Sequence, residues 1–115
     1  MTMKNAWIGN IDSPNFDFYG GQYSGNIPKR ESPLLPSAYK LMETIWEMER
    51  NGEYEARQLD WGAWGAKMSK RELSDFVDSF YGVDEAKDVR RFVQGLEHDK
   101  TYVLVALETG EDYGD

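Results

Sequence analysis

Residues Ser69–Glu108, SKRELSDFVDSFYGVDEAKDVRRFVQGLEHDKTYVLVALE, contain the strongest structural signals in the chain. The segment opens with Ser69-Lys-Arg-Glu72, a capping box whose serine and glutamate satisfy free backbone N–H groups at a helix start. The spacing predicts two amphipathic helices, the first ending at Gly82 and the second capped by Asp84. Their apolar stripes are Leu73, Phe76, Val77 and Phe80, then Val89, Phe92, Val93 and Leu96.

The stretch from Thr101 to Glu108 is apolar on both faces, which is typical of a strand buried between layers or at a sheet centre. A third helix is predicted from Ser37, as its cap, to about Asn51, with Gly52 as the stop. Residues 4–9 are predicted to form a short first strand. A further strand is expected over Glu53–Asp60, continuing through a bend at Trp61–Ala66 because glycines weaken a regular ladder.

Residues 10–36 are rich in Gly, Asn, Ser and Pro, with interleaved aromatic residues. We expect a loop or a hairpin here, with Gly20-Gly21 as the tight turn. The whole chain, residues 1–115, is predicted to be one α+β domain in which three amphipathic helices pack on a small, mostly antiparallel sheet of about 3–5 strands. Its parts are a strand plus aromatic loop over 1–36, a helix-strand-helix-helix-strand core over 37–108, and an acidic tail over 109–115.

Composition removes most catalytic chemistry. The chain has no Cys and a single histidine, His98, which excludes thiolate catalysis and every Cys-based metal site. Neither a GxSxG nucleophile motif nor a phosphate-binding glycine loop is present. The helical carboxylates are expected on solvated faces. We therefore expect a non-enzymatic protein with no catalytic residue, no metal and no cofactor.

The N-terminus lacks the apolar region of a signal peptide, and the longest apolar run, Tyr102–Leu107, is far shorter than a membrane span. These features predict a cytoplasmic protein that does not enter a membrane. Twenty-one Asp and Glu against thirteen Lys and Arg give a net charge of −8. Such a surface is repelled by nucleic acid, so direct nucleic-acid binding is not expected.

The negative charge is unevenly placed. Residues 34–66 hold six acidic and three basic groups, and the last fifteen residues hold four acidic groups with no basic partner. This pattern favours an interaction protein that occupies a basic site on a nuclease, a toxin or a nucleic-acid-binding protein, its carboxylates replacing phosphates. The predicted contact residues are Glu108, Glu111, Asp112 and Asp115, then Glu43, Glu47, Glu72, Asp75 and Asp78, with Trp61, Trp64 and Tyr113 as aromatic anchors.

Inhibitors and immunity or anti-defence proteins of bacteria and phages act in this manner. Two short stretches, Trp7–Asn10 and Gly20–Gly25, resemble antirestriction proteins that mimic DNA, and they are too short to assign a family.

Trp61 and Trp64 support an alternative function. Two rings flanked by glycine suit stacking on a sugar or a base, so a small-ligand or carbohydrate-binding module is the second hypothesis. The competing interpretation is that one ring lies in the core and the other packs on a helix. Trp7 and Trp46 are expected in the core, and a plain scaffold subunit is a third alternative.

Overall fold

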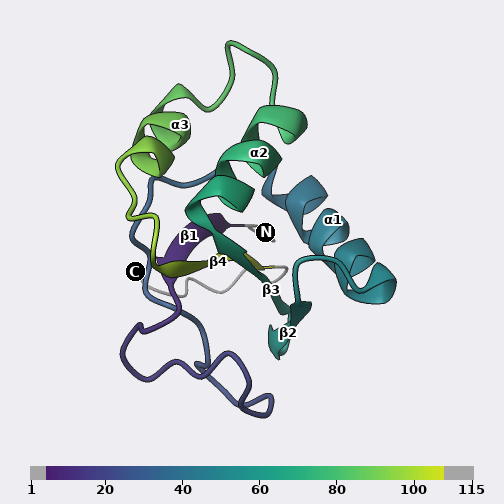
Figure 1. The fold of residues 1–115 in the computed structure, drawn as a ribbon. Coiled ribbons are helices and arrows are strands. Elements are labelled where there is room, and N and C mark those ends of the chain that lie inside the picture. The colour runs from purple at the N-terminus through teal and green to yellow at the C-terminus, as the bar shows by residue number, and fades with distance from the viewer. Residues whose placement is uncertain (1–4, 108–115) are drawn as a thin grey trace.

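The computed structural model of the chain describes residues 5–107, which form a four-stranded sheet with three helices (Figure 1). All strand pairs are antiparallel, and the strand order is β1-β4-β3-β2. The predicted α+β class is therefore confirmed. The elements are β1 (Ala6–Asn10), α1 (Ala38–Asn51), β2 (Ala56–Asp60), β3 (Ala63–Ser69), α2 (Lys70–Phe80), α3 (Lys87–Gln94) and β4 (Thr101–Leu107).

The last strand in the sequence, β4, lies at the centre of the sheet. Leu104 is paired with Ile8 of β1 on one side and with Ala66 of β3 on the other. Every residue of β4 after Thr101 is buried. The pattern of apolar residues on both faces therefore predicted a buried central strand correctly, because such a strand contacts a packed layer on each face.

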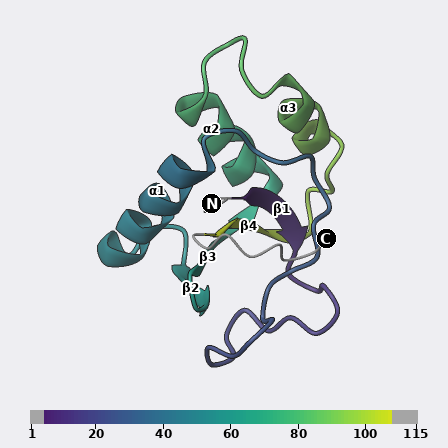
Figure 2. The ribbon, with the colours of Figure 1, turned by 180° about the vertical axis from the view of Figure 1, so that it is seen from behind.

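The two layers that cover the sheet differ in kind. The three helices lie on one face, and much of the loop between β1 and α1 lies on the other (Figures 1 and 2). Alternation along the strands divides the core accordingly, because successive side chains point to opposite faces. Ile8 and Leu104 pack with the helices, whereas Trp7, Val103 and Val105 pack with loop residues, chiefly Phe18.

This loop is not a hairpin, since residues 16–24 form turns without strand pairing. A buried asparagine organises it instead. The side-chain oxygen of Asn26 accepts a hydrogen bond from the N–H of Asp17 at 2.9 Å, and its amide group donates to the carbonyl oxygens of Asp17 and Leu59. These bonds satisfy backbone groups that a ladder would otherwise pair, and they attach the loop to β2.

Residues 56–69 form two strands rather than the one bent strand expected from the sequence. The chain reverses at Trp61 and Gly62, and Gly62 has a φ of 73°, a conformation that glycine adopts without steric cost. β2 and β3 therefore pair as a hairpin, with a register shift between Gln58 and Asp60. The helix-strand-helix-helix-strand order predicted for residues 37–108 had one strand between the first two helices, whereas the structure has two, β2 and β3.

The helix caps were predicted with mixed success. Both hydrogen bonds of the capping box at Ser69 and Glu72 are present, and α1 ends at Asn51 with Gly52 as its C-cap, as predicted. Ser37 precedes α1, but its side chain makes no capping hydrogen bond. The predicted Asp84 cap is wrong, because α3 begins at Lys87.

Within residues 5–107, no helix has both the length and the hydrophobicity needed to cross a membrane.

Candidate partner-binding site

The four tryptophans occupy different environments. Trp7 is buried, and its indole N–H donates to the carbonyl oxygen of Pro28 at 3.0 Å, as expected for a core residue. Trp61 lies in the β2–β3 turn and is 72% exposed. Trp64 is half-buried on the helical side of the sheet. The expectation that Trp46 belongs to the core is wrong, since this residue is 45% exposed.

Trp46 and Trp64 line one pocket of about 240 Å³ together with Met42 and Glu43. Helix α1 supplies three of these residues. Met42 and Trp46 are four positions apart, so they lie on the same side of the helix. Trp64 comes from β3, where it lies two positions before Ala66 and therefore on the same face, the one that packs with the helices. The pocket thus forms between α1 and β3, and Trp61 does not line it.

The charge at this pocket is negative and unbalanced. Glu43 and Glu47 are both exposed and lie one turn apart on α1. Within residues 5–107, neither carboxylate has an ion-pair partner. The Arg50 guanidinium lies over the Trp46 ring, 5.0 Å from its centroid. The pocket therefore combines two indole rings with Glu43, a carboxylate that makes no ion pair with another residue of 5–107.

The α2 carboxylates predicted as contacts lie elsewhere, since none of them lines the Trp46–Trp64 pocket. Glu72 accepts the N–H of Ser69 in the capping box at 2.9 Å. Asp78 is paired with Arg90 of α3. Only Asp75 among the three is exposed without a partner in the part of the chain that the structure describes. Two of the three acids therefore have structural roles.

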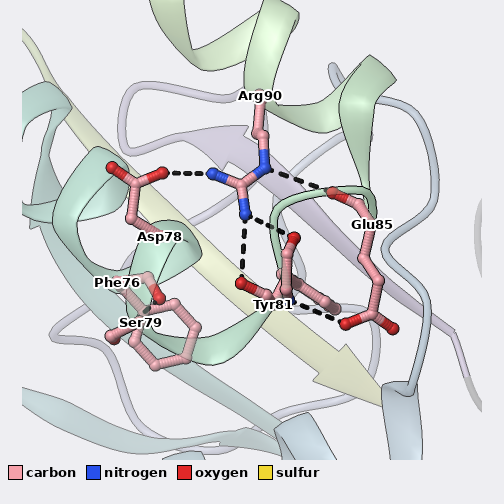
Figure 3. A network of polar contacts seen from close by, with 7 residues as sticks. Phe76, Asp78, Ser79, Tyr81, Glu85 and Arg90 are labelled. Atoms are coloured by element: carbon pink, nitrogen blue, oxygen red, sulfur yellow. Dashed lines mark hydrogen bonds and ion pairs between the residues drawn. The ribbon is translucent and has the colours of Figure 1, made fainter.

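Arg90 connects α3 to the end of α2 (Figure 3). Its guanidinium donates to Asp78 and to the carbonyl oxygens of Tyr81, Gly82 and Glu85, the last three at 3.1, 2.9 and 3.1 Å. The Tyr81 hydroxyl donates to the carbonyl oxygen of Pro36 at 2.5 Å. Burial raises the pKa of this hydroxyl, and the Glu85 carboxylate adds to the effect. This network stabilises the helical layer.

A second polar cluster attaches the aromatic loop to the sheet. The Tyr19 hydroxyl donates to Glu55 at 2.8 Å and accepts from Lys67, which also pairs with Glu55 at 3.3 Å. The hydrogen bond from Tyr19, and then that from Lys67, lower the pKa of Glu55. The hydrogen bonds with Tyr19 and Glu55 raise the pKa of Lys67. Both pKa shifts favour the charged forms that Glu55 and Lys67 have at neutral pH.

Five predicted contact residues lie outside the described residues: Glu108, Glu111, Asp112, Tyr113 and Asp115. Within residues 5–107, no three His, Asp or Glu side chains are grouped so that they could hold a metal ion. The residue that sequence reasoning missed is Trp46. Its signal was its place at the edge of the apolar stripe, between buried Ile45 and exposed Glu47, where a large ring is only partly covered.

Comparisons of this chain with protein-family models, with curated proteins and with solved structures found no match. The features of this chain that indicate a function are therefore the pocket, its charge and the composition of the chain.

Proposed function

We propose that this chain is a non-enzymatic interaction domain that binds a basic protein through the Trp46–Trp64 pocket and the carboxylates beside it. The partner would be a nuclease, a toxin or a nucleic-acid-binding protein whose basic site the domain occupies, as inhibitors and immunity or anti-defence proteins of bacteria and phages do. The observation that carries the proposal is the position of Glu43, which has no ion-pair partner among residues 5–107, in the lining of a pocket with two indole rings.

Each part of this site has a physical function in binding. Partly exposed aromatic rings supply apolar contact area, and they are common among the residues that dominate binding energy at interfaces. Glu43 and Glu47 are part of the net charge of −8, and they place negative charge on α1 at and beside the pocket. That charge attracts a basic partner over a distance and accelerates association, an effect that salt screens. The lack of Cys fits a reducing compartment such as the cytoplasm, where we propose that the domain acts.

The partner would be identified by affinity capture from a lysate of the source organism, carried out at low and at high salt. The purified partner is then titrated with the domain, with and without competing double-stranded DNA or RNA. We expect a basic protein, an affinity that falls steeply with salt, and competition by the nucleic acid. Three outcomes would contradict the proposal. They are a neutral partner bound at the pocket, a partner whose affinity does not change with salt concentration, and capture of no protein at low salt.

Glu43→Lys and Glu49→Lys form a matched pair for this titration. Both residues are exposed on α1, and only Glu43 lines the pocket. We expect Glu43→Lys to weaken binding about tenfold or more, because it places a like charge against the partner. Glu49→Lys should have a much smaller effect. Equal losses from the two variants would show that only overall charge matters.

The second candidate is a small-ligand or carbohydrate-binding module, and the same two indole rings are what favours it. The sequence predicted Trp61 and Trp64 as the stacking rings of such a module. In the structure Trp64 lines the pocket together with Trp46, and the exposed Trp61 does not line it. A neutral sugar stacked on these rings would bind with an affinity that hardly changes with salt. Titration with neutral mono- and oligosaccharides at two salt concentrations therefore separates the two functions.

A further inference from the structure

We infer that the Trp46–Trp64 pocket receives an arginine side chain of the basic partner, with the guanidinium group packed on indole and paired with Glu43. This inference rests on the proposed function for the source of the arginine. It adds to that function the chemical group that the pocket binds, the guanidinium group of an arginine.

The size of the pocket favours one side chain over a larger ligand. Its volume of about 240 Å³ lies below the roughly 300–1,000 Å³ of typical small-molecule sites. Met42 and the two indoles give it walls that match the alkyl part of a long side chain. Glu43 is the one charged residue among its lining residues, and its carboxylate suits a cation at the end of that chain.

Trp46 already contacts a guanidinium group in this structure. Arg50, one turn along α1, lies 5.0 Å from the ring centroid, within the range of about 6 Å over which a cation is attracted to an aromatic face. The contact with Arg50 therefore shows that the Trp46 ring is accessible to a guanidinium group. The Arg50 side chain itself is not part of the pocket lining.

Arginine fits these groups better than lysine does. A guanidinium group is planar and more weakly hydrated than an ammonium group, so it loses less on leaving water to lie against an indole. It can also pair with a carboxylate through two parallel N–H donors. A lysine would keep the attraction to Glu43 and lose the planar packing. We therefore expect the pocket to prefer arginine.

The test is a titration of the full chain with N-acetyl-arginine-N-methylamide, followed by ¹⁵N NMR of the indole N–H signals. Trp46→Phe and Trp64→Phe variants assign the two pocket signals. Trp7, buried and bonded to Pro28, and Trp61, exposed in the turn, serve as internal controls. We expect saturable shifts at Trp46 and Trp64, and none of comparable size at the controls.

Matched probes and variants define the chemistry. The citrulline analogue has the shape of arginine without its charge, and we expect it to produce no saturable shift. The lysine analogue should bind more weakly. Glu43→Gln should weaken the arginine probe by about threefold, the scale of an exposed ion pair, and Glu49→Gln should leave its affinity unchanged. Equal binding of citrulline or lysine, larger shifts at Trp61, or equal effects of the two Gln variants would overturn the inference.

The inference and the proposed function fail in different ways. Salt-sensitive capture of a basic protein, together with no saturable indole shift from the arginine probe, overturns the inference and leaves the proposed function standing. Specific indole shifts without capture of any basic protein support arginine selectivity of the pocket and contradict the proposed function.

Discussion

The carboxylate of Asp60 accepts a hydrogen bond from the backbone N–H of Gly25 at 2.9 Å, which joins the end of β2 to the aromatic loop. Its other oxygen accepts the N–H of Trp61 at 2.7 Å. Asp60 is 1% exposed, so both bonds lie largely out of water. One buried side chain thereby connects the β2–β3 turn to the layer that covers the second face of the sheet.

Replacing Asp60 by asparagine should destabilise the protein, because one of the two backbone N–H groups then loses its acceptor and the other keeps only a neutral one. We expect a loss of about 1–3 kcal/mol in the free energy of unfolding, measured with chemical denaturant. Asp12→Asn, an exposed substitution in the same loop, is the control and should change little. Equal stability of the two variants would contradict this role for Asp60.

Arg90→Lys should also destabilise the chain. A lysine has no planar fork, so it cannot reach Asp78 and the carbonyl oxygens of Tyr81, Gly82 and Glu85 together. We expect a loss of about 1–3 kcal/mol in thermal or denaturant unfolding. Arg91→Lys changes the neighbouring exposed residue, and it should leave stability unaltered. If Arg91→Lys were as harmful, the bonds of Arg90 could not be the cause.

The raised pKa of the Tyr81 hydroxyl leads us to expect a loss of stability at alkaline pH. Burial raises the pKa of its hydroxyl above the ordinary value of 10.0 in the folded state. In the unfolded chain the hydroxyl ionises at that ordinary pKa, so rising pH above it favours unfolding. The difference in unfolding free energy between the wild type and Tyr81→Phe should therefore be constant below this pH and shrink above it. A difference independent of pH would refute the effect.

Gly62→Ala should destabilise the β2–β3 turn, because the φ of 73° is unfavourable for a residue with a Cβ atom. The expected cost is about 1–2 kcal/mol in unfolding free energy. Gly21→Ala is the matched control, since a Cβ there meets no atom within 4 Å and the position does not have a positive φ. Similar stabilities of both variants would rule out a conformational requirement at Gly62.

Local patterns in the sequence were sufficient for several elements. The stripe of Leu73, Phe76 and Val77 and the capping box at Ser69 predicted α2, and the lack of alternation predicted the buried β4. Such signals are readable because each residue needs only its neighbours to define a face or an end. The β2–β3 turn was missed because the glycines near Trp61 suggested a bent strand, whereas Gly62 reverses the chain.

The sequence by itself thus determined the α+β class, the amphipathic helices and the acidic character of the chain. These depend on local periodicity and on composition. Only the tertiary structure decided the strand order β1-β4-β3-β2 and the attachment of the loop through Asn26 and Asp60. It also brought Trp46 of α1 beside Trp64 of β3 at one pocket. The reason is that these arrangements arise from the packing of whole elements, whose partners lie far apart along the chain.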